Sequence, residues 1–275
     1  MSSTNPADSA RRKAAVLGSP IAHSRSPQLH LAAYRALGLS GWTYDRIECR
    51  AEELPALVAT LGPEWVGLSV TMPDKFAALA VAEQRTARAE RVGSANTLVR
   101  TPTGWLADNT DVDGVRGALG SAAGEAVVLG SGGTAPAAVL ALAELGVNHI
   151  TVAARNPDTA SRAVAVAADV GVSARQVPLD GPDLGAAARC ASVVVSTLPA
   201  NVAARYAPLL ASVPVLLDAI YDPWPTPLAA AVMAAGGTVI SGLQMLLHQA
   251  FTQVELFTGQ LAPREAMAVA IAGSS

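Results

Sequence analysis

The chain is poor in cysteine and in aromatic side chains, and it has no long uninterrupted apolar run. Its two cysteines, Cys49 and Cys190, lie far apart and lack the neighbouring Cys or His residues of a metal site. Although 51% of the residues are hydrophobic, charged, polar or proline residues interrupt every stretch long enough to span a membrane. We therefore expect a reduced, metal-free, cytoplasmic protein with no membrane partner.

Lysine is also scarce, because only Lys13 and Lys75 among the nineteen basic residues are lysines. The formal net charge is -3 and the basic residues are scattered, so the chain lacks the basic stripe that nucleic acid binding requires. Arginine keeps its proton in a protein, whereas lysine can titrate. A lysine inside a structured segment, such as Lys75, therefore suggests a role in proton transfer, although chance is the alternative.

The first part of the chain alternates strand and helix patterns after a leader, residues 1–12, that we expect to be disordered. The predicted strands are residues 14–18, 42–48, 66–71, 97–100 and 105–107, and the predicted helices are residues 27–37, 52–61, 74–82 and 86–92. The last two strands flank a TPTG turn and predict a hairpin. At 275 residues the chain is long enough for a second domain.

A second series of elements follows a helix predicted over residues 111–119. Its predicted strands are residues 126–129, 150–154, 192–197, 213–220 and 238–240, and they alternate with alanine-rich helices such as 135–145 and 228–235. This order predicts a parallel, doubly wound α/β sheet. We expect the last helices, 243–258 and 264–272, to pack back onto the first domain. The predicted domains are residues 1–110 with 246–275, and residues 111–245.

A glycine-rich loop joins the first strand of the second domain to its first helix. The loop consists of Gly130, Ser131, Gly132, Gly133, Thr134 and Ala135. In dinucleotide-binding (Rossmann) domains the first glycine permits the turn, the second lets the backbone approach a pyrophosphate, and helix N-terminal amides bind the phosphates. The pattern predicts a dinucleotide site, with an ordinary glycine turn as the alternative.

The next strand ends at Ala154, Arg155 and Asn156, where an NAD enzyme would have an acidic residue for the ribose hydroxyls. An arginine instead can pair with a 2′-phosphate, which favours NADP(H) over NAD. The missing acid also argues against an S-adenosylmethionine methyltransferase. A solvated Arg155 and a non-catalytic nucleotide-sensing module remain open alternatives.

Two residues suit hydride transfer to a carbonyl, because this reaction places negative charge on the carbonyl oxygen and requires a proton donor. Lys75 lies where a buried strand gives way to a helix, a position that lines the clefts of α/β sheets. Asp111 leads into the second domain and could hold the lysine and a substrate hydroxyl. A structural salt bridge between them is the alternative.

Seven segments resemble the shikimate dehydrogenase family in sequence and order. They are GSPIAHSRSPQLH (18–30), SVTMPDK (69–75), GSANT (93–97), DNTDVDG (108–114), GSGGTA (130–135), YDPWPTP (221–227) and GLQMLLHQ (242–249). The resemblance implies the family's two-domain fold, in which the C-terminal helices complete the N-terminal substrate domain. It also implies the reversible NADPH-dependent reduction of 3-dehydroshikimate to shikimate.

The resemblance implies a role for individual residues as well. Ser24 and Ser26 would bind the substrate carboxylate, assisted by Tyr221 from the nucleotide domain. The residues that would meet the ring hydroxyls are Thr71, Lys75, Asn96, Asp111 and Gln249. Ala219 and Gly242 would border the nicotinamide. Taken singly, several of these have simpler explanations as a helix cap, a turn or a helix face.

The chain also departs from the family pattern. Ser69 stands where many relatives have asparagine, which predicts a shortened or lost substrate contact, and Thr159 stands where a second phosphate-binding arginine is usual. NADP preference then depends mostly on Arg155, with a lesser contribution from Arg162. Asp108 competes with Asp111 for the catalytic role. An NAD-using quinate/shikimate dehydrogenase is the nearest alternative, and we expect a monomer or homodimer.

Overall fold

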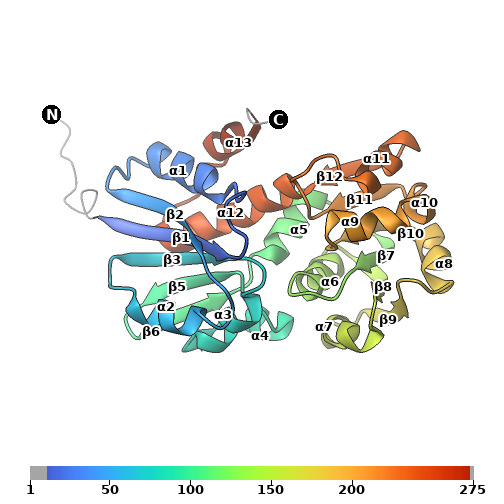
Figure 1. Cartoon of the computed structure of the whole chain (residues 1–275), viewed down its shortest axis with the longest axis horizontal. Helices are drawn as coiled ribbons and strands as arrows, with labels where there is room; N and C mark the ends of the chain where they lie inside the picture. The colour runs from blue at the N-terminus through green and yellow to red at the C-terminus, as the bar shows by residue number, and fades with distance from the viewer. Residues whose placement is uncertain (1–10, 273–275) are drawn as a thin grey trace. The chain divides into compact units, whose positions relative to one another are not determined.

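The computed structural model describes residues 11–272, apart from the side chain of Pro157, and consists of two compact α/β units (Figure 1). One unit runs to Thr110 and resumes at Gln249, and the other spans Asp111–His248. Residues 1–10 of the predicted leader lie outside the described residues. The prediction of disorder is wrong at Arg12, which begins the first strand because it pairs in register with Trp42.

The first unit is built on a six-stranded mixed sheet. Its strands are β1 (Arg12–Gly18), β2 (Trp42–Glu48), β3 (Trp65–Val70), β4 (Gln84–Arg85), β5 (Thr97–Thr101) and β6 (Gly104–Asp108). Its helices are α1 (Ser26–Ala36), α2 (Leu54–Thr60), α3 (Lys75–Val81), α4 (Ala87–Val92), the later part of α12 (Gly242–Thr258) and α13 (Arg264–Ala272). The strand order is β2-β1-β3-β5-β6-β4.

The directions of these strands bring several loops to one edge of the sheet. Strand β1 runs parallel to β2 and β3, β5 runs antiparallel to β3, and β6 returns antiparallel to β5. The carboxyl ends of β1, β3 and β6 and the amino end of β5 therefore share this edge. The edge collects segments that are far apart in sequence.

Helices cover both faces of this sheet. Alternating residues of β1 and β3, such as Leu17 and Leu68, pack with Leu54 of α2 and Ala78 of α3 in one buried cluster. On the other face α12 approaches closely, because a β-carbon at Gly67 would overlap the ring of Phe257. Helix α1 packs against α13 (Figure 1). Both faces are thus buried, which leaves the edge as the place for a site.

The second unit contains a six-stranded parallel sheet. Its strands are β7 (Gly124–Leu129), β8 (Val147–Ala154), β9 (Ser173–Pro178), β10 (Ala191–Ser196), β11 (Val215–Asp218) and β12 (Thr238–Ser241). Its helices are α5 (Asp111–Leu119), α6 (Ala135–Glu144), α7 (Ser161–Asp169), α8 (Asp183–Cys190), α9 (Ala200–Ala203), α10 (Ala207–Leu210), α11 (Pro227–Ala234) and the start of α12, with the 3-10 turns η2 (Pro157–Ala160) and η3 (Ala204–Tyr206).

The strand order of this sheet is β12-β11-β10-β7-β8-β9, which is the doubly wound order of dinucleotide-binding domains. The predicted two-domain α/β fold with a parallel Rossmann sheet is confirmed. The order reverses between β7 and β10, and ligands bind beyond the carboxyl ends of the strands at such a switch point. Helix α6 begins there and is buried over its first eight residues, Ala135–Leu142, since its small alanines permit close packing.

The prediction lacked the edge strand β9 and gave no residue ranges for the helices that flank it, α7 and α8. In β9 only Val177 is buried, so the segment has no apolar alternation that would reveal a strand. Strand β4 is two exposed residues held by β6, and it was missed for the same reason. Among residues 11–272, no helix is both long and apolar enough to span a membrane.

Candidate active site

The loop after β1 presents two buried hydroxyls. Ser24 and Ser26 are each 5% exposed, and their Oγ atoms lie 3.3 Å apart. Arg46 of β2 donates from Nε (2.9 Å) and Nη2 (2.6 Å) to the carbonyl of Ser24, which holds the loop in place. Two convergent hydroxyls can donate to both oxygens of a carboxylate. This arrangement supports the predicted carboxylate site.

The loop after β3 passes very close to β1. Gly18 ends β1, and a β-carbon there would overlap the methyl group of Thr71 and meet the carbonyl of Met72 at 2.9 Å. Glycine is therefore required at this crossing. Thr71 follows β3 directly, and Lys75 is the first residue of α3, where its carbonyl accepts from the Ala95 amide (2.9 Å). Both predicted residues thus lie at the edge that carries Ser24.

Asn96 and Gln249 are brought together although 153 residues separate them in the chain. The Nδ2 group of Asn96 donates to Oε1 of Gln249 (2.6 Å), and its Oδ1 accepts from the amide of Thr110 (2.7 Å). Asn96 is 1% exposed. One amide therefore links α12 to the loop that precedes α5.

Asp111 follows Thr110 directly and begins α5, where it is buried. Lys75 belongs to the first unit, whereas Asp111 and Tyr221 belong to the second. The Lys75–Asp111 pair and the role of Tyr221 therefore stay predictions.

Asp108, the competitor of Asp111, is engaged inside the first unit. Burial would raise the pKa of its carboxyl, but hydrogen bonds from Arg88 and Thr86 outweigh burial and lower the pKa. Arg88 binds both oxygens, from Nε and Nη2 at 2.6 Å each, and Thr86 donates at 2.7 Å. Both oxygens of Asp108 are thus already bound by Arg88 within the first unit, and Asp111 stays the candidate for the catalytic role.

The glycine loop has the geometry that a dinucleotide phosphate requires. Gly130 has a φ of +106°, and a β-carbon there would overlap the hydroxyl of Thr197. Among the described residues no atom lies within 4 Å of a β-carbon placed on Gly132, so this side of the loop is available to a ligand. Thr134 precedes α6 without a side-chain cap, and no acidic residue lies in the first turn. The loop fits a bound pyrophosphate.

The loop after β8 is tied to the glycine loop. Ser131 Oγ lies 2.6 Å from Oγ1 of Thr159, the residue that replaces the family's second arginine. Ala154 is buried at the end of β8, whereas Arg155 and Asn156 are exposed, and Asn156 Oδ1 accepts from the Asp158 amide (3.0 Å). Arg155 is thus exposed beside a hydrogen-bonded turn.

The predicted nicotinamide residues lie where α12 begins. A β-carbon on Gly242 would overlap the carbonyl of Ala219, and the Gly242 amide donates to the Ile220 carbonyl (3.2 Å). Asp218, which ends β11, is fully buried and accepts from Thr226 Oγ1 (2.7 Å). Burial raises the pKa of Asp218, whereas the hydrogen bonds from Thr226 and from the Ile220 amide oppose this rise. Hydrogen bonds thus hold the segments on both sides of Tyr221 in place.

Two further polar residues, one in each unit, were not predicted. Thr197 follows β10 at the switch point, where its amide (2.9 Å) and hydroxyl (2.8 Å) both donate to the Leu129 carbonyl. Gln253 lies one helical turn after Gln249 and contacts Asn96 and Thr97. Two sequence signals could have identified them: Thr197 is a polar residue directly after a parallel strand, and Gln253 lies four residues after Gln249 on the same helix.

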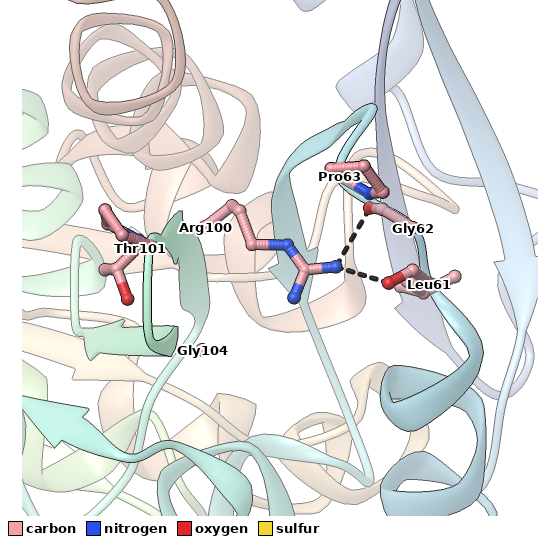
Figure 2. Close-up of a pocket in the computed structure, with 7 residues that line it drawn as sticks. Leu61, Gly62, Pro63, Arg100, Thr101 and Gly104 are labelled. Atoms are coloured by element: carbon pink, nitrogen blue, oxygen red, sulfur yellow. Dashed lines mark hydrogen bonds between the residues drawn. The ribbon is translucent and has the colours of Figure 1, made fainter.

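A separate hollow of about 570 Å³ lies beside the turn of the β5–β6 hairpin (Figure 2). Arg100 reaches across it and donates to the carbonyls of Leu61 and Gly62, the latter at 2.9 Å. The residues that line it are Leu61, Gly62, Pro63, Arg100, Thr101, Pro102 and Gly104. None of the predicted site residues is among them, so this hollow is not the candidate site.

Two family models match the chain. Residues 16–98 match the shikimate dehydrogenase substrate binding domain, and residues 242–270 match the shikimate 5'-dehydrogenase C-terminal domain. The matched ranges include the loops after β1 and β3 and all of α12, whose later part belongs to the first unit.

Whole-chain similarity extends beyond these segments. A shikimate dehydrogenase (NADP(+)) of Anaeromyxobacter sp. (strain Fw109-5) is 38% identical over 94% of each chain. The crystal structure of Mycobacterium tuberculosis shikimate dehydrogenase is 72% identical with a TM-score of 0.92, over 94% of this chain and 99% of that one. A quinate dehydrogenase from Corynebacterium glutamicum in complex with NAD is 26% identical with a TM-score of 0.80, over 96% and 99%. The chain belongs to the shikimate dehydrogenase family.

Proposed function

We propose that this protein is an NADP-dependent shikimate dehydrogenase that interconverts 3-dehydroshikimate and shikimate in aromatic amino acid (chorismate) biosynthesis. Family membership supports the reaction. The main structural support for the substrate site is that the two serine hydroxyls, Lys75 and the Asn96–Gln249 pair lie along the same edge of the first sheet. Hydroxyls and amides that both donate and accept suit a small polyhydroxy acid.

In this proposal residues 1–110 with 246–275 form the substrate domain and residues 111–245 form the dinucleotide domain. The two compact units support this division, in which α12 passes from one unit to the other. The helix begins beside the predicted nicotinamide residues and continues to Gln249.

The second unit would hold NADP(H) at the ends of β7 and β8. Gly130–Ala135 would bind the pyrophosphate through backbone amides, and Arg155, with Asn156 next to it in the chain, would pair with the 2′-phosphate. Ala219 and Gly242 would border the nicotinamide. When bound, NADPH supplies the hydride that reduces the substrate ketone.

The remaining groups bind the substrate and supply the proton that the reduction requires. Ser24, Ser26 and Tyr221 bind the carboxylate, and Thr71, Asn96 and Gln249 bind ring hydroxyls. As the carbonyl oxygen becomes an alkoxide, the ammonium of Lys75 donates the proton that neutralises it. The Asp111 carboxylate holds the ammonium and a hydroxyl in place.

The test of this function is the initial rate of cofactor reduction with shikimate and with quinate, each offered with NADP and with NAD. We expect rapid turnover with shikimate and NADP. Lys75→Ala should lower kcat roughly a hundredfold or more, while its circular dichroism spectrum stays unchanged. Lys13→Ala is a matched control, because Lys13 is the other lysine and is not among the proposed site residues. Its Nζ atom lies 5.7 Å from the centroid of the Trp65 ring. An active Lys75→Ala enzyme would exclude the proposed mechanism.

An NAD-using quinate/shikimate dehydrogenase is the second candidate, since the Corynebacterium glutamicum relative binds NAD and is a quinate dehydrogenase. The exposed Arg155 after β8 favours NADP instead. Faster turnover with quinate or with NAD would assign the chain to that branch. No turnover in any combination would favour a non-catalytic nucleotide sensor.

A cytoplasmic location and a monomeric or homodimeric state are also part of the proposal. Cys49 and Cys190 are both free thiols, as expected in a reducing compartment. Size-exclusion chromatography with light scattering would distinguish a monomer from a dimer.

A further inference from the structure

A buried chain of hydrogen bonds lies beneath Asn96 and Gln249, and its centre is Gln253 of α12. This side chain is 3% exposed. Its Nε2 group donates to the Thr97 hydroxyl (2.9 Å) and to the backbone carbonyl of Asn96 (3.3 Å). Its Oε1 accepts from the Ser69 hydroxyl (2.7 Å) and lies 3.3 Å from His30 Nε2. Each polar atom of Gln253 therefore has two partners.

Backbone groups fix the orientation of the Gln253 and Asn96 side-chain amides. A carbonyl only accepts, so the NH2 group of Gln253 must face Asn96. Thr97 Oγ1 then accepts from Gln253 and uses its own proton to donate to Asn96 Oδ1 (2.8 Å). The Thr110 amide also donates to this Oδ1, which leaves Asn96 Nδ2 facing Gln249.

The orientation of Gln249 follows from that of Asn96. Because Asn96 Nδ2 is a donor, the Gln249 atom 2.6 Å from it must be the accepting Oε1. The NH2 group of Gln249 is then the part of that side chain that can reach a ligand. A ligand atom bound there must be an acceptor, such as a hydroxyl or carbonyl oxygen.

The hydrogen bonds on the Ser69 side of this series also have a defined donor and acceptor. Ser69 donates to Gln253, so the hydroxyl of Tyr44 donates to Ser69 (2.6 Å). The ring of His30 stacks on that of Tyr44 with centroids 4.0 Å apart. Burial lowers the pKa of His30 to about 3 against the hydrogen bond to Gln253, and burial raises the pKa of Tyr44 above its usual range. Both groups therefore stay neutral at working pH, and the hydrogen-bond directions do not change.

We infer that Gln253 is a positioning residue for substrate recognition, acting through Thr97 and Asn96 to present the NH2 group of Gln249 as a hydrogen-bond donor. The inference rests on the proposed function, in which Asn96 and Gln249 bind ring hydroxyls. Gln253 itself does not touch the substrate.

The experiment compares Gln253→Met, which keeps the length but removes the amide, with Thr97→Val, which removes the hydroxyl at equal volume. Each should raise KM for shikimate roughly tenfold, with KM for NADP changed by less than about twofold and a smaller change in kcat. The double variant should be no worse than the more impaired single variant, since both break one chain. Thr252→Ala, one residue away on α12, should behave as wild type.

Unchanged KM for shikimate in a folded Gln253→Met enzyme, or additive effects in the double variant, would overturn the inference. If Gln253→Met does not fold, two variants of Thr97 replace it in the test. Thr97→Ser should keep the wild-type KM for shikimate, whereas Thr97→Val should raise it. Equal KM values in the two variants would refute the proposed role of these hydrogen bonds. Gln249→Ala separates the two proposals. A normal KM in Gln249→Ala would overturn the substrate site and this inference with it, whereas a raised KM there with an unaffected Gln253→Met overturns the inference alone.

Discussion

Asp74, the residue before Lys75, is a buried carboxyl whose ionisation should destabilise the fold. It is 0% exposed, and among the described residues neither of its oxygens has a hydrogen-bond donor in bonding geometry. Burial, and after it the charges of Glu52 and Glu53, raise the pKa of Asp74 from 3.8 to about 6, while the nearby Cys49 thiol opposes them. We predict that Asp74→Asn stabilises the protein at neutral and alkaline pH.

The sign of the effect follows from proton binding. Between about pH 4 and pH 6 the unfolded chain has lost this proton while the folded chain keeps it, so stability falls as pH rises through this window. Above about pH 6 both states are ionised, and the full cost of burying the charge is present. A shift of about two pKa units corresponds to about 3 kcal/mol. Asparagine removes the charge at nearly constant volume, so the variant should recover up to this amount above pH 6 and little near pH 4.

Thermal unfolding monitored by circular dichroism at about pH 4 and about pH 8 tests this expectation. For a chain of this size about 3 kcal/mol corresponds to a Tm increase of about 6–10 °C, and the increase should appear mainly at the higher pH. Asp45→Asn, at an exposed aspartate of β2, is the control and should show no such pH dependence. A Tm difference for Asp74→Asn that is negative at high pH, or equal at both pH values, would refute the reasoning.

Two further predictions concern the cofactor. Gly132→Ala should leave Tm unchanged, since nothing lies within 4 Å of its β-carbon, but raise KM for NADP roughly tenfold or more because the methyl group blocks the pyrophosphate; Gly130→Ala, at a φ of +106°, should lower Tm as well. Equal Tm losses in both variants would contradict this account. Arg155→Ala should raise KM for NADPH about tenfold or more and narrow its advantage over NADH, and an unchanged preference would exclude Arg155 from 2′-phosphate binding.

Much of the fold could be predicted from the sequence, because most elements bury one face and are bounded by glycine or proline. The helix predicted over residues 111–119 has the bounds Asp111–Leu119, and the last helix likewise has the predicted bounds Arg264–Ala272. The edge strand β9 could not be predicted, since an edge strand buries little and its pairing partner β8 lies outside the local pattern. Hydrogen bonding to β8, rather than burial of apolar side chains, makes residues 173–178 a strand.

The candidate site was predictable to the extent that its residues follow the ends of strands. Thr71 and Asn96, which the family resemblance had singled out, lie beside β3 and β5 at the shared edge. Gln253 was not predictable in this way, because its partners lie 156 and 157 residues earlier in the chain. Its function as a hydrogen-bonding centre exists only after α12 has packed onto the sheet.

Ser69 shows why a departure from a family pattern requires the structure for its interpretation. Serine at this position predicted a shortened or lost substrate contact. In the structure Ser69 is only 4% exposed, and its hydroxyl bonds within the protein, accepting from Tyr44 and donating to Gln253. The Gln253 amide that accepts from Ser69 also donates to the carbonyl of Asn96. Substrate affinity in this enzyme should therefore depend less on residue 69 itself than on the amide that Ser69 holds in place.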